Sequence, residues 1–403
     1  MPALSPINAP SSPAAKRATL AVVGLAFFTD TLVYAMLPPL LPEYARLHGL
    51  NQTRLGLLFA SYAVALLLAT LPLGAWVDRR GRRGPFLAGL VGLGATTILF
   101  AYARSFPMLL LARVLQGVAA TANWVAGLAL LSAQFPSGQR GRAMSAVFAC
   151  TNLGLLLGPA FSGWMLQHWS AHAAFLAAAG LAVLDALARL ALLPPDQPAP
   201  PVRTRYLALL RDGAVRVLAG TMVLGAILGS LLEAVLPLHL SRRLGMDGES
   251  IGLVFATAAL ASTFISPAAG LWTDRRGAAR PIRLGLALAA LLLAVAAFVP
   301  SRPAMFVFMF LVGGTCSLLM SPCGPALAGR VEGMAEAGQG SAFALLNMSF
   351  SLGIMVGPMV GSALVDLVGL PAALAGFALV CACYLLPAGR LSAAAAGSAG
   401  SAS

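Results

Sequence analysis

Long apolar stretches separated by short polar ones dominate this chain of 403 residues. A helix needs about 20 predominantly apolar residues to cross the hydrocarbon core of a bilayer. The sequence contains twelve such stretches, so the pattern predicts an all-α membrane protein with twelve transmembrane helices. The predicted spans are residues 19–42, 55–77, 85–103, 107–132, 143–167, 173–193, 217–240, 250–273, 281–299, 303–328, 340–365 and 370–388.

One longer connection divides the twelve spans into two sets of six. The segment PPDQPAPPVRTRYLALLRDGAVR follows the sixth span and combines a proline cluster with four arginines, which is typical of a linker. The ends of the chain are rich in Ala, Ser and Pro and lack an apolar run. The predicted organisation is a disordered cytoplasmic N-tail (1–18), an N-terminal six-helix half (19–193), a cytoplasmic linker (194–216), a C-terminal six-helix half (217–389) and a disordered C-tail (390–403).

Two motifs occur once in each half at nearly the same separation. The pattern GxxxGP begins at Gly154 in span 5 and at Gly353 in span 11, 199 residues later. GAWVDRRGRR begins at Gly74 after span 2, and GLWTDRRGAAR begins at Gly270 after span 8, 196 residues later. Such duplication predicts two pseudo-symmetric halves, as in transporters whose halves rock around a site near the middle of the bilayer.

The low charge content excludes a soluble protein, and the distribution of charge predicts the topology. Only 10% of residues are charged, compared with about 25% in soluble domains. The net charge of +13 lies between apolar runs rather than in a polar patch, so we expect no nucleic-acid partner. With both termini in the cytoplasm, eighteen of the 26 basic residues face that side and six face the other. We therefore expect a multi-pass protein of the inner (plasma) membrane, in contact with the lipid bilayer.

Five charged residues lie well inside the predicted spans, where each is costly unless it faces a cavity or a partner. They are Asp30, Arg113, Asp185, Arg189 and Glu233. Asp30 lies about 17 Å into span 1, near the midplane of the bilayer. We interpret it as a carboxylate that faces a cavity and binds a cation or a proton.

Glu233 and Arg113 lie at similar depths, about 11 Å and about 9 Å from the outer ends of spans 7 and 4. They are predicted to pair, with Arg113–Asp30 as the competing pair and a purely structural ion pair as the alternative. Arg113 would tune the carboxylates, since arginine does not release its proton. Asp185 and Arg189 are spaced i, i+4, which indicates a structural pair with Arg189 reaching toward the cytoplasm.

The duplicated motifs predict moving parts. Gly81 can supply the positive φ of a tight cytoplasmic turn, and the charges beside it are candidates for a gate between the halves. Glycines and a proline in spans 5 and 11 permit close packing and bending. The predicted gating residues are Gly74, Asp78, Arg79, Gly81, Arg82, Arg83, Gly270, Asp274, Arg275 and Gly277. The predicted bending residues are Gly154, Gly158, Pro159, Gly163, Gly353, Gly357 and Pro358.

Polar and aromatic side chains on the same spans are candidates for the wall of a cavity. Aromatic faces attract organic cations, whereas ordinary packing is the alternative for each residue. The candidates are Tyr34, Tyr62, Gln116, Asn123, Trp124, Asn152, Asn347 and Phe350. No nucleophile–base pair and no metal-ligand cluster is evident, so we expect neither an enzyme nor a bound cofactor or metal.

At these motifs the sequence resembles the drug:proton antiporters of the major facilitator superfamily. The loop from Gly74, the RxxQG pattern from Arg113 and the GxxxGP pattern from Gly154 carry the resemblance. FFTDTLVYAMLPPLLP around Asp30 and LLEAVLPLHL around Glu233 are most similar to vesicular amine transporters and their bacterial relatives. The eukaryotic members' lysine in span 2 falls at Tyr62, and their acids in spans 10 and 11 fall near Ser317 and Asn347.

The resemblance implies a proton-coupled secondary active transporter. It would exchange protons for amphipathic, cationic drugs or amines by alternating access, as in multidrug efflux, and would function as a monomer. Two alternatives remain open. The protein could export a neutral metabolite such as a sugar or an amino-acid derivative, or it could be a membrane sensor that binds its ligand without transporting it.

Overall fold

The computed structural model describes residues 13–135, 137–192, 209–331 and 339–399, and within them twelve helical segments are long and apolar enough to cross a membrane. The prediction of twelve spans is therefore confirmed. The helices are α1 Pro13–Ala35, α2 Leu37–His48, α3 Gln52–Arg80, α4 Arg83–Ala101, α5 Phe106–Gln134, α6 Ser137–His168, α7 Ala171–Leu192, α9 Gly213–Leu244, α10 Gly248–Arg276, α11 Ala279–Val295, η1 Ala296–Phe298, α12 Arg302–Met320, α13 Cys323–Val331, α14 Gln339–Val368 and α15 Leu370–Ala399.

Prolines interrupt two of the spans. The first span consists of α1 and α2, which are separated at Met36, just before Pro38 and Pro39. The tenth span consists of α12 and α13, with Pro322 between them. Proline lacks the N–H that would continue the helix, so the chain bends at both points.

The ends of the chain differ in part from the prediction. The last helix, α15, continues through residues 390–399, where the sequence predicts a disordered tail. A run of alanines favours helix there, which the low-complexity composition alone does not indicate. Helix α1 begins at Pro13, inside the predicted N-tail. Most of that tail (1–12), most of the predicted linker (194–208) and residues 400–403 lie outside the described residues.

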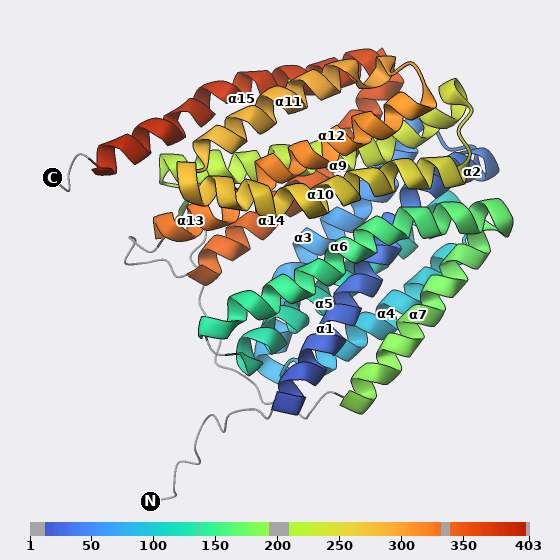
Figure 1. The fold of residues 1–403 in the computed structure, drawn as a ribbon. Helices are drawn as coiled ribbons and strands as arrows, with labels where there is room; N and C mark the ends of the chain where they lie inside the picture. The colour runs from blue at the N-terminus through green and yellow to red at the C-terminus, as the bar shows by residue number, and fades with distance from the viewer. Residues whose placement is uncertain (1–12, 136, 193–208, 332–338, 400–403) are drawn as a thin grey trace, which may run out of the picture.

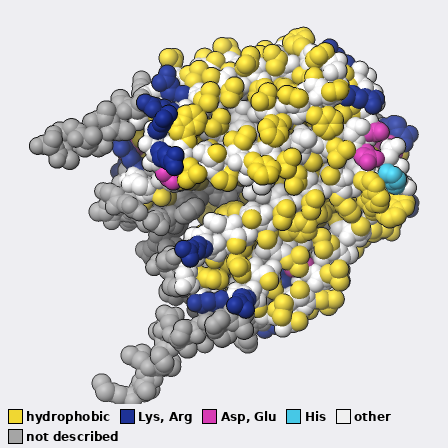
Figure 2. Space-filling view, in the orientation of Figure 1, with side chains coloured by type: hydrophobic (Ala, Val, Ile, Leu, Met, Phe, Trp, Pro, Cys, Tyr) yellow, Lys and Arg dark blue, Asp and Glu magenta, His cyan; other side chains and the backbone are white. Residues whose placement is uncertain are grey.

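The helices form two bundles, one from α1 to α7 and the other from α9 to α15 (Figure 1). In Figure 1 the two bundles diverge toward the left and approach each other at the right, near α2. Apolar side chains cover the middle of the surface shown in Figure 2, and charged side chains gather at its left and right ends. This distribution fits a protein that spans a bilayer from left to right in this view.

The two repeated loops form equivalent turns. Gly81 follows α3 with a φ of 84°, and Gly277 follows α10 with a φ of 75°. Residues with side chains rarely adopt this conformation, so glycine is required at both turns. The positive φ predicted for Gly81 is confirmed. The basic residues of these turns, together with the ends of α3 and α10, define what we call the arginine-rich side.

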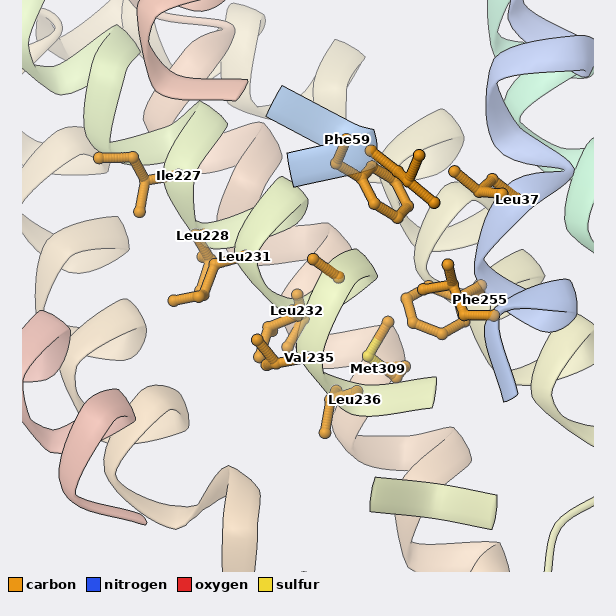
Figure 3. Packing of buried hydrophobic residues seen from close by; sticks show 14 of the residues in the cluster. Leu37, Phe59, Ile227, Leu228, Leu231, Leu232, Val235, Leu236, Phe255 and Met309 are labelled. Atoms are coloured by element: carbon orange, nitrogen blue, oxygen red, sulfur yellow. The ribbon is translucent and has the colours of Figure 1, made fainter. Parts of the chain in front are cut away.

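At the opposite end of the molecule the two bundles are in contact, and we call this the sealed side. Apolar side chains form a continuous cluster there that includes Leu37 and Phe59 from the first bundle and Phe255 from the second (Figure 3). Burial of such side chains holds the bundles together without a fixed direction of contact. The precise fit comes from two helix crossings, α6 with α10 and α3 with α14.

Glycines allow the backbones to touch at both crossings. A Cβ atom at Gly252 of α10 would overlap the carbonyl oxygen of Pro159 in α6. In the equivalent place, a Cβ atom at Gly56 of α3 would overlap the carbonyl oxygen of Pro358 in α14. Backbone atoms cannot move aside as a flexible side chain can. Close contact at the sealed side therefore depends on these two glycines.

The two crossings differ one turn further along. Where α6 meets α10, the backbones of Gly163 and Gly248 are in direct contact. Where α3 meets α14, Gln52 donates hydrogen bonds to the carbonyl oxygen of Ala234 at 2.7 Å and to Ser362 Oγ at 3.4 Å. The sealed side thus combines one apolar crossing and one hydrogen-bonded crossing.

A carboxylate strengthens the hydrogen-bonded crossing. Oδ2 of Asp366, near the end of α14, accepts hydrogen bonds from the backbone N–H and the hydroxyl of Thr53 at 2.8 and 2.6 Å. Thr53 lies in the first turn of α3, where unpaired N–H groups and the helix dipole favour a negative charge. Asp366 therefore stabilises the N-terminus of a helix that belongs to the other bundle.

The close contact at the sealed side predicts the effect of adding one methyl group. Gly252→Ala should separate α6 from α10 and shift the protein toward a conformation that is open on the sealed side. Spin labels at positions 102 and 242, on outer ends of the two bundles, would report this as a longer distance in electron paramagnetic resonance. The measurement uses protein in which the five native cysteines have been replaced.

Gly180→Ala in α7 is the matched control, because a Cβ atom there meets nothing within 4 Å. It should leave the distance distribution unchanged. A Gly252→Ala protein with the same distribution as the control would contradict the role given to this crossing.

Candidate functional site

Three of the predicted intramembrane charges lie on helices that meet in the interior. Asp30 is on α1, Arg113 on α5 and Glu233 on α9. Asp30 and Arg113 are each 2% exposed, and Glu233 is half-buried. Each is far enough from the helix ends that bulk water on either side does not hydrate it freely, so its surroundings decide what it can bind.

The carboxylate of Asp30 has only one hydrogen bond within the described residues. Its Oδ2 accepts from Nε1 of Trp124 at 2.7 Å, and its Oδ1 is buried without a hydrogen-bond partner. An ionised carboxylate can accept about four hydrogen bonds, so much of its capacity is unused. This incomplete pairing is what a site for a cation or a proton requires.

The residue bonded to this carboxylate belongs to an aromatic cluster. The ring centroid of Trp124 lies 4.1 Å from that of Phe27, on which it stacks, and 6.2 Å from that of Phe148. Phe27 is fully buried, whereas Phe148 is 41% exposed. An organic cation at Asp30 would therefore lie beside the indole of Trp124, a ring that attracts positive charge.

Glu233 is hydrogen-bonded across the boundary between the bundles. Its Oε2 accepts from the hydroxyl of Tyr34 at 3.0 Å, and Tyr34 lies on α1 of the other bundle. A hydrogen bond to a charged group contributes roughly 1.5–3 kcal/mol. This contact breaks if the two bundles move apart at this level.

Arg113 is held by aromatic rings and amide oxygens instead of by a carboxylate. Its guanidinium lies 4.8 Å from the centroid of Tyr62, and it donates to Gln116 Oε1 at 3.1 Å and to the Leu58 carbonyl at 3.4 Å. Neither predicted ion pair forms in the described residues, since no carboxylate oxygen of Glu233 or Asp30 lies within 4.0 Å of Arg113. Tyr34 lies between Arg113 and Glu233, with its ring 5.9 Å from the guanidinium.

The three residues together carry one net negative charge. Asp30 and Glu233 contribute two negative charges when ionised, and Arg113 contributes one positive charge. Because Arg113 lies within electrostatic range of both carboxylates without bonding either, it weakens their repulsion and leaves both free to bind. A monocation or a proton would bring the site to neutrality.

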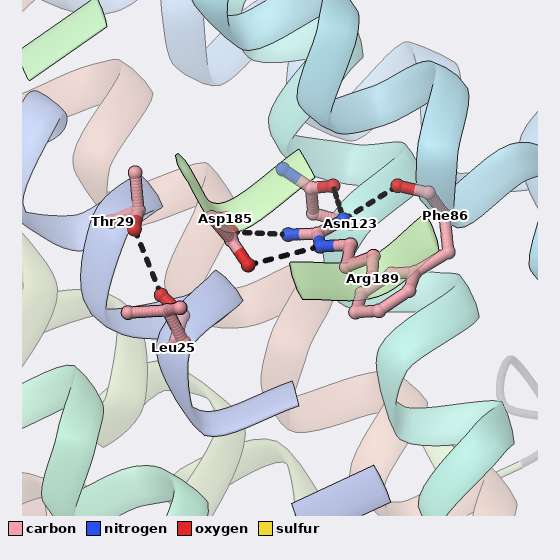
Figure 4. A network of polar contacts seen from close by, with 6 residues as sticks. All are labelled: Leu25, Thr29, Phe86, Asn123, Asp185 and Arg189. Atoms are coloured by element: carbon pink, nitrogen blue, oxygen red, sulfur yellow. Dashed lines mark hydrogen bonds and ion pairs between the residues drawn. The ribbon is translucent and has the colours of Figure 1, made fainter. Parts of the chain in front are cut away.

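The second intramembrane pair forms as predicted, but Arg189 stays buried inside the first bundle (Figure 4). Arg189 donates to both carboxylate oxygens of Asp185, at 2.8 and 3.3 Å, and both side chains are completely buried. Arg189 also donates to the Phe86 carbonyl at 2.6 Å and to Asn123 Oδ1 at 3.1 Å. The prediction that Arg189 reaches toward the cytoplasm is wrong, because acceptors in the interior satisfy the guanidinium better.

The predicted cavity residues divide into three groups. Tyr34, Tyr62 and Trp124 contact Glu233, Arg113 and Asp30, respectively. Gln116 and Asn123 are at most 1% exposed and lie inside the first bundle instead of on a cavity wall. Gln116 bonds Arg113 and Thr97, and Asn123 bonds Arg189. Asn152 and Phe350 are half-buried, and Asn347 is exposed.

A hollow of about 490 Å³ lies at the sealed side, remote from Asp30, Arg113 and Glu233. Its lining mixes polar and apolar side chains from both bundles, with Glu43 and Arg46 on one side and Asp247 on the other. Glu43 and Arg46 already form an ion pair at 2.6 Å. We regard this hollow as an outer recess between the bundles and not as the binding site.

The proposed gating residues lie at the arginine-rich side. Asp78 is half-buried in the last turn of α3, whereas Asp274 at the end of α10 is exposed. Nearby, Asp212 caps α9 and pairs with Arg330 at 3.3 Å. Partial burial favours a higher pKa for Asp212, but the N–H groups of Val215 and Ala214 together with Arg330 outweigh burial and lower it. The gate itself stays a prediction.

Sequence reasoning missed some of the residues around the charges. Phe148 and Phe27 are apolar residues in apolar helices, and no pattern distinguishes them from ordinary packing. Thr53 and Asp366 lie at helix ends, where polar residues are expected. A contact between Thr53, at the start of one span, and Asp366, near the end of another, could have been predicted only if the arrangement of the helices were already known.

Comparison with known proteins identifies relatives over most of the chain. The family profile described as Major Facilitator Superfamily matches residues 23–239 and 217–396. The chromaffin granule amine transporter of Homo sapiens is 28% identical over 368 residues, covering 86% of this chain and 69% of that protein. A probable vesicular acetylcholine transporter of Danio rerio is 27% identical, covering 92% and 78%. The chain spans about 62–69% of the length of the amine transporters that it matches.

Solved structures share the fold at low sequence identity. A bacterial homologue of the human lysosomal transporter Spinster, in an inward-facing and occupied conformation, has a TM-score of 0.79 at 14% identity, covering 94% of this chain and 97% of that one. The human organic anion transporter MFSD10 (TETRAN) has a TM-score of 0.69 at 22% identity, covering 94% and 100%. The relatives and the fold are those of transporters and not of enzymes.

The Tyr34–Glu233 hydrogen bond predicts a measurable coupling between two bundles. In a double-mutant cycle of Tyr34→Phe and Glu233→Gln, the effects on the free energy of unfolding should be non-additive by about 1.5–3 kcal/mol. Reversible unfolding in mixtures of dodecyl sulfate and mild detergent would measure each variant. Tyr62→Phe combined with Glu233→Gln is the control, and it should be additive; equal coupling in both cycles would argue against the specific bond.

Proposed function

Because the chain belongs to the Major Facilitator Superfamily, we propose that it is a proton-coupled antiporter that exports an organic monocation, an amine or a related cationic drug, by alternating access. The observation that carries this proposal is the Asp30 carboxylate, which is buried and, among the described residues, bonded only by the indole of Trp124. This combination suits an aromatic or alkyl ammonium ion better than a neutral solute.

The names of the relatives agree with this chemistry. They transport amines and acetylcholine, which are positively charged at neutral pH. The net charge of −1 at Asp30, Glu233 and Arg113 would be balanced by one such ion. A neutral sugar or amino-acid derivative would leave the buried negative charge uncompensated.

The orientation follows from the distribution of arginine. The arginine-rich side would be cytoplasmic, because basic residues in short loops are retained on that side. The sealed side then faces outward, and the structure corresponds to an inward-facing state. Both termini would lie in the cytoplasm of a cell bounded by an inner (plasma) membrane, and the transporter would work as a monomer.

The two carboxylates would take different parts in the cycle. Asp30 is bonded by Trp124 of its own bundle, so its surroundings move with it as the bundles rock. Glu233 is bonded by Tyr34 of the other bundle, so rocking removes its partner and exposes it to protons. In the proposed cycle the cation enters at Asp30 from the cytoplasm, the sealed side opens, and protons from outside displace the cation.

Asp78 and the neighbouring arginines would close the cytoplasmic side in the outward-facing state. In that state the turns at Gly81 and Gly277 would approach the opposite bundle, and their charges could pair across the boundary. The glycines and prolines of α6 and α14 would act as the bending points, because these helices contact both their own bundle and the other one.

Transport of a permanently charged substrate tests the proposal. In proteoliposomes with an acidic interior, the wild-type protein should accumulate N,N,N-trimethyltryptamine, which cannot cross the bilayer as a neutral base. Asp30→Asn should reduce the initial rate at least 10-fold, since the substrate loses its counter-charge. The control is Asp274→Asn, at an exposed carboxylate, assayed for equilibrium binding of the same cation, which it should not change.

Transport of the neutral analogue tryptophol distinguishes a cation antiporter from an exporter of neutral solutes. The antiporter proposal is rejected if wild-type protein and Asp30→Asn accumulate the cation equally, or if tryptophol is transported in both. If neither compound moves under any gradient but the cation binds, the protein is a sensor.

A further inference from the structure

The buried pair Asp185–Arg189 lies beside the proposed cation site and has more contacts than a self-contained ion pair needs. Besides Asp185, the guanidinium of Arg189 bonds a backbone carbonyl of α4 and the side chain of Asn123 in α5. It also lies over the ring of Phe86 at 3.8 Å. The pair thus ties three helices of the first bundle together in a region where all the named side chains are fully buried (Figure 4).

Asn123 connects this pair to the cation site, because it precedes Trp124 in the chain. Successive residues of a helix point about 100° apart, so Asn123 faces Arg189 while Trp124 faces Asp30. The Asn123 amide packs closely against α4, since a Cβ atom at Gly89 would lie 2.6 Å from its Oδ1. The bond from Arg189 is what orients this amide, because its Nδ2 has no hydrogen-bond partner among the described residues. Fixing the Asn123 side chain fixes the rotation of α5 and thereby the direction of the Trp124 indole.

Besides bonding Arg189, Asp185 balances its positive charge. Arg189 lies near Asp30, because it bonds Asn123 and the next residue in the chain, Trp124, bonds Asp30. Paired with Asp185, Arg189 adds no net charge to the region. Without Asp185 it would present an uncompensated positive charge that competes with a cationic substrate for Asp30.

We propose that Asp185, Arg189 and Asn123 form a positioning unit for the cation site. Arg189 holds Asn123 so that Trp124 points at Asp30, and Asp185 cancels the charge of Arg189 so that Asp30 stays available to the substrate. None of the three contacts the substrate. The role of the charges rests on the proposed function, whereas the positioning of Trp124 does not.

The charge argument predicts effects that differ between the two partners of the pair. Asp185→Asn should weaken equilibrium binding of N,N,N-trimethyltryptamine to the purified protein at least 10-fold. The double variant Asp185→Asn/Arg189→Gln restores the charge balance and should bind at least about threefold more tightly than Asp185→Asn. It should match Arg189→Gln alone, in which Asp185 can take up a proton, and both should bind more weakly than wild type because Arg189 no longer holds Asn123. Thermal stability of each variant is measured in parallel.

If the Asp185–Arg189 pair only stabilises the fold, the variants should show a different pattern of binding and stability. Both single variants would then lose binding in proportion to their loss of thermal stability, and the double variant would recover binding only as far as it recovers stability. That pattern overturns the charge role. Weakened binding in Asp185→Asn with rescue in the double variant, out of proportion to stability, supports it.

Fluorescence of Trp124 tests the positioning without any ligand. The other four tryptophans, Trp76, Trp164, Trp169 and Trp272, are replaced by phenylalanine. Indole emission depends on the hydrogen bond and the charge at the ring, so Asp30→Asn and Asn123→Leu should shift the Trp124 maximum in the same direction. Gln167→Leu, at an exposed position near the other end of α6, is the control and should not shift it.

The two measurements separate the failure of this inference from the failure of the proposed function. If Asn123→Leu leaves the emission of Trp124 at its wild-type position, the positioning unit is rejected whatever the protein transports. If the emission shifts as expected but the wild-type protein binds no cation, the positioning of Trp124 stands and the proposed function is wrong.

Discussion

A charged side chain inside a bilayer needs a partner within the protein. In this molecule the buried charges differ in how many hydrogen-bond partners they have. Asp185 and Arg189 satisfy one another, and additional acceptors from two neighbouring helices complete the coordination of the guanidinium. Arg113 is surrounded by tyrosine rings and amide oxygens. Asp30 and Glu233 have one side-chain hydrogen bond each within the described residues. Oδ1 of Asp30 and Nη2 of Arg113 are buried without hydrogen-bond partners among the described residues, so unused bonding capacity lies at the proposed site.

These contacts also differ in which bundle supplies them. The hydrogen bond to Asp30 comes from its own bundle, so it can persist while the bundles move. The hydrogen bond to Glu233 crosses between bundles, as do the contacts of Gln52 and Thr53 at the sealed side. In the proposed cycle, movement of the bundles would change the surroundings of Glu233 and open the sealed side in one step. Such a link between a titratable group and a gate would couple transport to protons.

The internal repeat explains why the two helix crossings at the sealed side are similar. Positions at which the two repeats differ make the crossings unequal. Gly56 and Gly252 meet Pro358 and Pro159 in equivalent crossings, so the two halves use the same backbone contact twice. One turn further, the pair Gly163 and Gly248 is replaced at the other crossing by Ser362 and Gln52. One crossing depends on van der Waals contact alone, and the other adds directional bonds. The two crossings need not separate with equal ease.

Much of the fold could be read from the sequence, because the thickness of the bilayer sets a local requirement that each apolar stretch meets on its own. Twelve spans, their approximate limits, the internal repeat, the positive φ of Gly81 and the depth of the buried charges all follow from short-range patterns. The partners of those charges do not. The predicted Arg113–Glu233 pair is interrupted by Tyr34, Arg189 points inward instead of toward water, and Asn123 faces that arginine instead of a cavity. Which face of a helix meets which neighbour is set by packing among residues far apart in the chain, so only the tertiary structure decides where each side chain finds its partner.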